Sequence, residues 1–179
     1  ILLAIKTNKI DAALYDAEPL REIFKKDKSL ALLGETLFSF DVGVGFNKKN
    51  NQLKDRFNTF LAEIKANGIY DDMVNRWMIK GEIVMPEISE PKTEATLWVG
   101  VSDGNLPFTI VKDNQLIGFD IELSKRFAAF EGKNIKFLNM DFGSLIAAVS
   151  TGKADMIASS IYVTNERKKQ IDFSDPYYF

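Results

Sequence analysis

The stretch "MDFGSLIAAVSTGKADMIAS", residues 140–159, decides the fold class. Its first part predicts a helix with Asp141 as N-cap and Gly152 at its end, because Asp favours the N-cap and Gly the position just past the last turn. The apolar run that follows, 154–159, has the length of a buried strand. A helix that leads directly into a strand is typical of α/β folds with a parallel sheet.

The same phrase occurs twice in the chain. "TNKIDAALYD" begins at Thr7 and "TGKADMIASS" begins at Thr151, and both read Thr, any residue, Lys, an apolar residue and Asp, followed by small and apolar residues. The first copy therefore predicts a helix end followed by a strand over 10–15. Any helix–strand junction resembles another to some degree, but the favoured interpretation is that the chain contains two lobes of related structure.

The first 80 residues alternate between helix and strand signals. A helix is expected from Asp16, with Pro19 in its first turn, and strands are expected over 30–35 and 38–47. Two amphipathic helices follow, separated at Gly68. The apolar positions expected to face a core are Phe40, Val42, Val44 and Phe46 in the second strand, Leu53, Phe57, Phe60, Leu61 and Ile64 in the first helix, and Ile69, Met73 and Trp77 in the second.

Residues 81–94 show no sustained period and contain Pro and several acids, which predicts a linker. From residue 95 a second block alternates strands with helices, which predicts an α/β sheet whose ligands gather beyond the carboxyl ends of its strands. The elements expected there are a strand at 96–102, a hairpin at 107–119 turning at Asp113 and Asn114, a helix at 119–132, strands at 134–140 and 154–159, and a short helix from Thr164 as N-cap.

Composition excludes several kinds of function. The 179 residues include no Cys and no His, so the usual zinc sites, disulfides and imidazole catalysis are excluded, and no cofactor or metal is expected. A net charge of −2 gives no field directed at nucleic acid. No run approaches the ~20 apolar residues of a membrane helix. Lys6, Lys9 and Asp11 interrupt the apolar start, so no signal peptide is visible, and the chain is interpreted as a piece of a longer protein.

The motifs "GFDIELSKRFA", "MDFGSLIAAVSTGKADMIAS" and "TNERKKQIDFSDPYYF" resemble the first half of a type II periplasmic solute-binding protein of the polar amino-acid-binding branch. Residues 1–80 resemble the second half of such a protein, in "TNKIDAALYDAEP" and in "FSFDVGVGFNKKNNQLKDRFNTFLAEIKANGIYDDMVNRWM". The resemblance implies an α/β Venus flytrap fold with a parallel sheet flanked by helices. It also implies that the two halves stand in reversed order.

Two explanations fit the reversed order: a piece that spans the junction of tandem binding modules, or a circular permutation. The linker and the ragged ends favour the tandem piece. On this interpretation 1–36 is a partial far lobe, 37–80 supplies a return strand and closing helices, 81–94 is the linker, and 95–179 is the first-lobe segment of the next module. Residues 37–179 would then nearly complete one lobe.

The resemblance also implies a set of ligand-binding residues. Arg167 would bind the carboxylate of an amino acid, since a guanidinium fork matches a carboxylate. The alternative for Arg167 is a surface ion pair with Asp172 or Asp175. Asp103 follows a predicted strand and would contact the ammonium group or the side chain of the ligand, unless it only caps the next turn.

Four further positions complete this expected site. Phe142 would stack on the ligand, although core packing is the default for Phe. Ser160 and Tyr162 match positions that offer a backbone carbonyl and usually a hydroxyl, and Tyr162 departs from that pattern. Asp16 matches the far-lobe carboxylate that binds the ammonium group, unless it is only an N-cap. In a tandem junction Asp16 would belong to a different module's site.

The resemblance implies extracytoplasmic binding of an amino acid or a similar small polar solute, in the periplasm or at the cell surface, by lobe closure. Delivery to the membrane permease of an ABC transporter is the expected use, and a ligand-sensing module of a membrane-bound sensor kinase is the alternative. No acid/base pair or histidine signals an enzyme. The exposed surfaces of unmatched lobes also predict a homodimer of the chain.

Overall fold

The computed structural model describes residues 1–179 except 16–19, 21–26, 28 and 32–37, and the chain forms two compact units, Ile1–Ser39 and Phe40–Phe179. In the first unit, α1 (Leu2–Lys6) buries none of its residues, and Lys6 bonds to Asp27. The predicted strand at 10–15 is wrong: these residues have no partner strand among the described residues, and an unpaired apolar run is not a strand. The predicted helix from Asp16 and the strand at 30–35 lie almost wholly outside the described residues.

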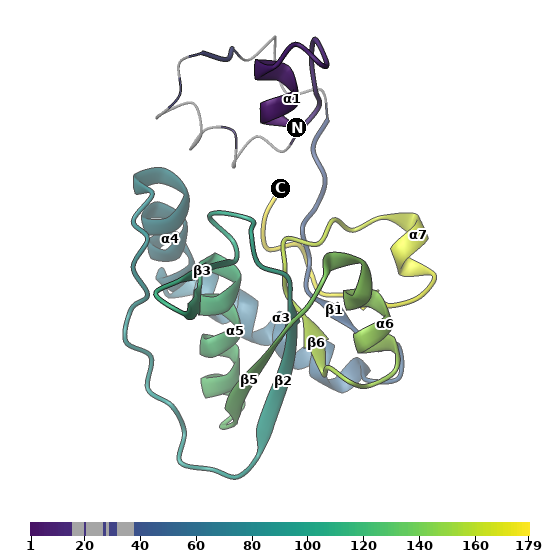
Figure 1. Ribbon diagram of the computed structural model, residues 1–179. Helices are drawn as coiled ribbons and strands as arrows, with labels where there is room; N and C mark the ends of the chain where they lie inside the picture. Colours follow the sequence, from purple (N-terminus) through teal and green to yellow (C-terminus); the bar gives the residue numbers. More distant parts are fainter. Residues whose placement is uncertain (16–19, 21–26, 28, 32–37) are drawn as a thin grey trace. The chain divides into compact units, whose positions relative to one another are not determined.

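The second unit contains a sheet flanked by helices, with a separate hairpin (Figure 1). In chain order its elements are β1 (Gly45–Phe46), α3 (Asn51–Ala66), α4 (Ile69–Val74), the π-helical turn η1 (Asn75–Lys80), β2 (Thr96–Val101), β3 (Ile110–Lys112), β4 (Gln115–Ile117), α5 (Phe119–Phe130), β5 (Asn134–Asn139), the 3₁₀ turn η2 (Phe142–Ser144), α6 (Leu145–Ser150), β6 (Met156–Ile157), α7 (Asn165–Lys168) and β7 (Asp172–Phe173).

The sheet is mixed, with the strand order β5-β2-β6-β1-β7. Strands β5, β2 and β6 are parallel, as predicted, but β1 runs antiparallel to both of its neighbours. The predicted parallel strands flanked by helices are therefore present, and β1 makes the sheet mixed. Helix–strand alternation fixes the direction only of strands joined by a crossover, and β1 reaches its place from a distant part of the chain. The strand predicted over 38–47 is also shorter than expected, because beyond β1 only Val42 forms an isolated bridge.

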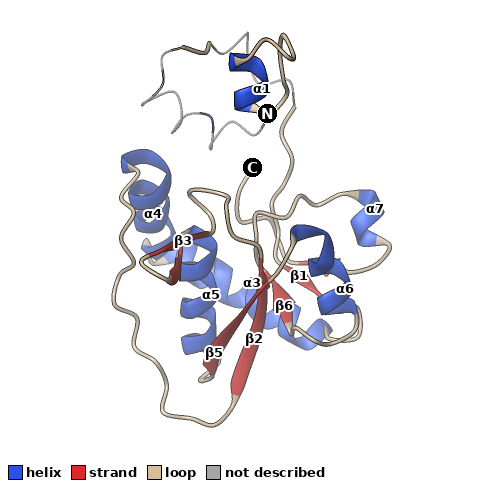
Figure 2. Ribbon diagram, in the orientation of Figure 1, coloured by secondary structure: helices blue, strands red, loops and turns tan. Residues whose placement is uncertain are grey.

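The two faces of the sheet pack against different helices (Figure 2). Side chains alternate along a strand, so Leu97, Val99 and Val101 of β2 enter the larger core with α3 and α5. On the other face, Ile157 packs with α6 in a smaller cluster. Gly45 of β1 faces this cluster, and a Cβ there would lie 2.7 Å from Ile157 Cγ1, so a larger residue would force the Ile157 side chain to move.

Helices α3 and α5 present the apolar faces that the sequence predicts. The five predicted positions of α3 are buried, and its Phe57 and Phe60 lie 5.0 and 5.4 Å from the Phe127 ring of α5. Met73 and Trp77 are likewise buried, whereas Ile69 is half-buried. Phe40 departs from its predicted face and is exposed. Segments from both predicted halves of the chain therefore share one core.

Turns and caps follow the sequence in most places. Asp113 and Asn114 take φ values of 50° and 60° between β3 and β4, as a tight hairpin turn requires. The Thr164 side chain accepts from the Arg167 N–H at the start of α7, which confirms the predicted cap. Asp141 occupies its expected N-cap position but forms no side-chain capping bond, and η2 intervenes before α6. Residues 81–94 contain no helix or strand.

Candidate functional site

The segments that follow β2, β5 and β6 are bonded to one another at the carboxyl edge of the sheet. The Asp103 backbone N–H donates to Asn139 Oδ1 at 3.2 Å, and Asn139 is the last residue of β5. Ser159, just beyond β6, accepts from the Ser102 N–H at 3.1 Å and donates to the Ser102 carbonyl at 3.0 Å. The exposed Asp103 thus stands at the edge where ligands of parallel sheets gather.

Ser160 continues this edge in an uncommon backbone conformation. Its φ is +43°, in the left-handed region that non-glycine residues seldom adopt. The Ser160 N–H donates to Asp120 Oδ2 at 2.6 Å, and Asn105 Nδ2 donates to Ser160 Oγ at 2.5 Å. Ser160 is therefore held from both its backbone and its side chain.

Arg167 is half-buried in α7 and lies against an aromatic ring. Its guanidinium carbon is 5.3 Å from the Phe142 ring centroid, a cation–π distance, and its Nη1 donates to the Tyr162 carbonyl at 2.9 Å. Burial lowers the pKa of the guanidinium, partly offset by Tyr162. Within the described residues Arg167 forms no ion pair with a carboxylate, and Asp172 instead pairs with Lys54 at 3.7 Å. The alternative role of Arg167, a surface ion pair with Asp172 or Asp175, is therefore not observed among these residues.

Phe142 and Tyr162 both lie beside Arg167 but differ in surroundings. Phe142 is 43% exposed, so it does not belong to the core, the default for Phe. Tyr162 is half-buried, its backbone bridges to Val42, and its ring stacks on Phe40 at 5.2 Å between centroids. The structure thus brings Arg167, Phe142 and Tyr162 together.

Asp120 is a site-adjacent residue that the sequence analysis missed. It is fully buried near the start of α5, where its Oδ1 accepts from the Tyr177 hydroxyl at 2.7 Å and its Oδ2 from Ser160. Burial raises the pKa of Asp120 to about 6, and the bonds from Tyr177 and Ser160 partly offset that rise. The available signal was an acid between two core residues, Phe119 and Ile121, where a solvated charge is not expected.

Asp16 lies outside the described residues, so its proposed contact with the ammonium group stays a prediction. The ligand roles of Asp103, Phe142, Ser160, Tyr162 and Arg167 stay predictions too. Their positions at one edge of the sheet are what the structure establishes.

A second buried carboxylate belongs to the packing of helices. Glu122 accepts from Arg76 Nη2 at 2.7 Å, from Arg126 Nε at 2.9 Å and from Trp77 Nε1 at 2.7 Å. Arg76 and Trp77 come from η1, so this carboxylate bonds the segment before residues 81–94 to a helix that follows them. Glu122 is fully buried with its charge compensated by two guanidinium groups.

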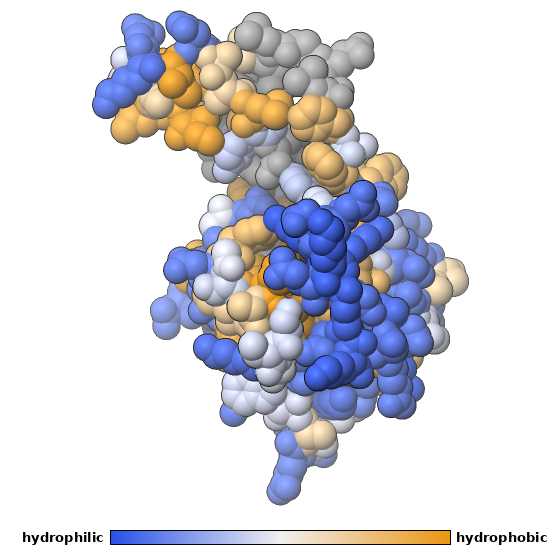
Figure 3. Space-filling model, turned by 90° about the vertical axis from the view of Figure 1, so that its right-hand side faces the viewer, coloured by the Kyte–Doolittle hydropathy of each residue, from blue (hydrophilic) through white to orange (hydrophobic). Residues whose placement is uncertain are grey.

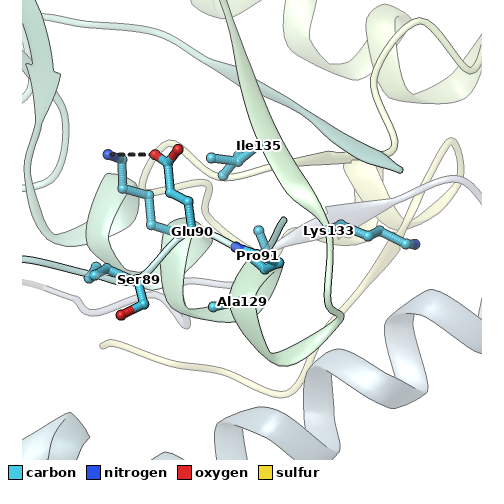
Figure 4. Close-up of a pocket in the computed structure, with 9 residues that line it drawn as sticks. Ser89, Glu90, Pro91, Ala129, Lys133 and Ile135 are labelled. Atoms are coloured by element: carbon cyan, nitrogen blue, oxygen red, sulfur yellow. Dashed lines mark ion pairs between the residues drawn. The ribbon is translucent and has the colours of Figure 1, made fainter. Parts of the chain in front are cut away.

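A small pocket, open to solvent, lies away from this edge (Figure 4). Ser89, Glu90 and Pro91 form one wall, and Glu90 pairs with Lys125 of α5 at 4.0 Å. Its other lining residues include Ile135, near the start of β5, whereas the predicted site lies beyond the last residues of the strands. This pocket is therefore separate from the candidate site.

The face that carries α6 and α7 is mostly hydrophilic, with an apolar patch among the polar side chains (Figure 3). No helix among the described residues combines the length and the hydrophobicity needed to cross a bilayer. Nor do the described parts of the chain hold a group of three Asp or Glu side chains fit for a metal ion.

Comparisons with known proteins concern the second half of the chain. Residues 97–179 match the family model of bacterial extracellular solute-binding proteins, family 3. A probable histidine-binding protein of Campylobacter jejuni is 40% identical over 90 residues, which cover 50% of this chain and 35% of the relative. The arginine-binding extracellular protein ArtP of Bacillus subtilis is 43% identical over 82 residues, which cover 46% of this chain and 32% of the relative.

Among solved structures, the arginine-bound domain 1 of an arginine-binding protein, TmArgBP, is 41% identical over 51% of this chain and 74% of that chain, with a TM-score of 0.47. The chain spans about a third of the length of the curated relatives it matches.

Proposed function

We propose, from the premise that residues 97–179 belong to the bacterial extracellular solute-binding proteins, family 3, that the protein binds a free amino acid outside the cytoplasm and delivers it to the permease of an ABC transporter. Relatives named as histidine-binding and arginine-binding proteins support an amino acid as the ligand. The proposed activity is binding and release without chemical conversion. The periplasm or the cell surface is the proposed location.

The observation that carries this proposal is the environment of Arg167. Its guanidinium lies over the half-exposed Phe142 ring and has no acidic partner among the described residues, so its charge is available to an anion. The carboxylate of an amino acid satisfies a guanidinium with two parallel bonds. Asp103, exposed at the same edge, supplies the opposite charge for an ammonium group.

Isothermal titration with a panel of L-amino acids tests the proposal. We expect binding by the wild-type protein and a loss of about 10- to 150-fold in affinity for Arg167→Ala, because hydrogen bonds to charged groups contribute about 1.5–3 kcal/mol. Arg56→Ala is the matched control, since Arg56 is an exposed arginine that pairs with Glu131. Absence of heat with every amino acid from a folded sample, or equal affinities for Arg167→Ala and wild type, would overturn the proposal.

The reversed order of the two halves stays a prediction, as does the homodimer. Sedimentation of the chain over a range of concentrations tests the homodimer, and a monomer at the highest concentration would contradict it.

A further inference from the structure

Ser160 adopts a left-handed backbone conformation, which is unfavourable for residues other than glycine. A φ of +43° brings the Cβ of an L-residue close to its own backbone, so some other interaction must hold the residue there. Ser160 follows β6 at the edge that also carries Asp103, and Tyr162 and Arg167 come soon after it in the chain. The conformation of Ser160 therefore sets the course of the chain toward Tyr162 and Arg167.

The Asp120 carboxylate is the group best placed to hold Ser160. The bond from the Ser160 N–H to Asp120 Oδ2, at 2.6 Å, fixes the orientation of the peptide group that precedes Ser160. The other carboxylate oxygen, Oδ1, accepts from the buried Tyr177 hydroxyl at 2.7 Å. Asp120 itself is anchored, because its N–H donates to the Phe108 carbonyl at 3.0 Å.

The groups that donate to the Asp120 carboxylate are neutral. Tyr177 is the titratable residue bonded to it, and behind Tyr177 the hydroxyl of Tyr70 in α4 donates to the Tyr177 carbonyl. Glu122 follows two residues later in α5, but its carboxylate is bonded to Arg76 and Arg126. Among the described residues no cation pairs with Asp120, so its ionised form depends on the Ser160 and Tyr177 donors.

We infer that Asp120 is a positioning residue of the ligand site: its ionised carboxylate holds Ser160 in the left-handed conformation and thereby aligns the segment that leads to Tyr162 and Arg167. The inference rests on the proposed function, since it concerns the same site. It goes further in assigning control of that site to a buried acid that does not touch the ligand.

The protonation state of Asp120 gives the inference a distinctive signature. The pKa of Asp120 is raised to about 6, first by burial. Once protonated, the carboxyl group must itself donate a hydrogen, so it no longer accepts fully from both Ser160 and Tyr177. If ligand binding requires the ionised form, affinity falls about tenfold between pH 8 and pH 5, one factor of ten for each unit below the pKa.

Isothermal titration at pH 5, 6, 7 and 8 tests this with L-glutamine and L-arginine, whose ionised groups do not titrate in that range. We expect the tenfold change for the wild-type protein and a flat profile for Asp120→Asn. Ser124→Ala is the matched control, because Ser124 is a buried residue one turn further along α5 whose hydroxyl donates to the Asp120 backbone carbonyl and not to its carboxylate. The control should keep the wild-type profile, and a wild-type profile in Asp120→Asn would overturn the inference.

Tyr177→Phe provides a second variant in case Asp120→Asn does not fold. It removes one donor that favours the ionised carboxylate, so the midpoint of the affinity profile should move to higher pH. A residue with a merely structural role would lower affinity without moving this midpoint. An unmoved midpoint in folded Tyr177→Phe would count against the inference.

A measurement without ligand separates this inference from the proposed function. The Ser160 amide proton resonance should lie downfield in the wild-type NMR spectrum and move upfield as pH falls through about 6, because its acceptor loses charge. If Arg167→Ala abolishes binding but the Ser160 amide resonance does not change with pH, the inference about Asp120 fails and the proposed function stands. If the resonance titrates but no amino acid binds, the function fails, and with it the assignment of Asp120 to a ligand site.

Discussion

Asp120 and Glu122 lie two residues apart near the start of α5, and both carboxylates are fully buried. Glu122 is bonded to two guanidinium groups and an indole N–H. Among the described residues, the Asp120 carboxylate is bonded to a hydroxyl and a backbone N–H, and its pKa is raised to about 6. Two equally buried carboxylates thus differ in their partners, since Glu122 accepts from charged groups and Asp120 from neutral ones.

The origin of those partners differs as well. The Glu122 cluster joins η1 to α5, so it contributes to the packing of two chain segments that lie on either side of 81–94. The Asp120 cluster joins α5 to Ser160 and Tyr177, beside the candidate site. We therefore expect substitutions at Glu122 to lower stability, and substitutions at Asp120 to change how the protein responds to pH.

The largest expected effect is that of Glu122→Gln. Removing the charge leaves Arg76 and Arg126 without their shared counter-ion, and breaking a buried ion pair typically costs about 3–5 kcal/mol of unfolding free energy. Urea denaturation followed by tryptophan fluorescence measures the loss. Glu166→Gln is the control, since its pair with Lys169 is exposed and should contribute at most about 1 kcal/mol. Equal losses in both variants would remove the contrast.

Asp120→Asn should change the pH dependence of stability. The folded pKa, about 6, lies above the ordinary value of 3.8, so between these values the folded state binds more protons than the unfolded state. The Asp120 contribution to stability is therefore complete below about pH 4 and is lost as pH rises through about 6, by about 3 kcal/mol at 1.36 kcal/mol per unit.

Unfolding free energies of wild type and Asp120→Asn, measured from pH 4 to pH 7, give this contribution as a difference. As pH rises, the unfolding free energy of Asp120→Asn should increase relative to that of the wild-type protein. A constant difference would mean that Asp120 keeps an ordinary pKa when folded.

Tyr177→Phe should have a smaller effect of about 1–3 kcal/mol at pH 7, because it leaves a buried carboxylate oxygen without its donor. The loss should shrink near pH 4, where the carboxyl group is neutral. Thermal unfolding at the two pH values measures it. In Tyr70→Phe, where the lost bond goes to a backbone carbonyl, the loss should be equal at both pH values. If the loss of stability in Tyr177→Phe is also the same at both pH values, the Tyr177 hydroxyl is not coupled to the charge of Asp120.

Ser160→Gly should have the smallest effect, a gain of about 0.5 kcal/mol, because glycine adopts positive φ without steric cost. The substitution retains the backbone N–H that bonds to Asp120. Ser150→Gly, at the end of α6, should lose stability instead, by up to about 1 kcal/mol. Urea denaturation distinguishes the two, and a loss in Ser160→Gly would show that its Oγ bond to Asn105 outweighs the strain.

Hydrophobic periodicity predicted the parts of the fold that depend on local sequence. The buried face of α3, the hairpin turn at Asp113 and Asn114, and the Thr164 cap all follow from spacing or residue type. The strand at 10–15 failed because an apolar run becomes a strand only with a partner. The direction of β1 could not be predicted, since nothing local specifies which distant strands it pairs with.

The candidate site was predicted only in part. Family motifs assigned Arg167 and Phe142 to one ligand site, which stays a prediction, and the structure brings the two side chains into contact. Asp120 and Glu122 were missed because acidic residues on a helix are ordinarily solvated, and their partners come from distant segments. Two acids alternating with Phe119, Ile121 and Leu123 were the sign that no face of this first turn is solvated.

The position of β1 has a consequence for the order in which the protein folds during synthesis. Gly45 and Phe46 pair with Ile157 and Met156 on one side and with β7 on the other, so their partners are synthesised more than a hundred residues later. At about 5–20 residues per second, the ribosome leaves this strand and the apolar face of α3 without their sheet for several seconds. Contacts so distant in sequence also slow folding, so this interval is when the nascent chain is most exposed to aggregation and to chaperones.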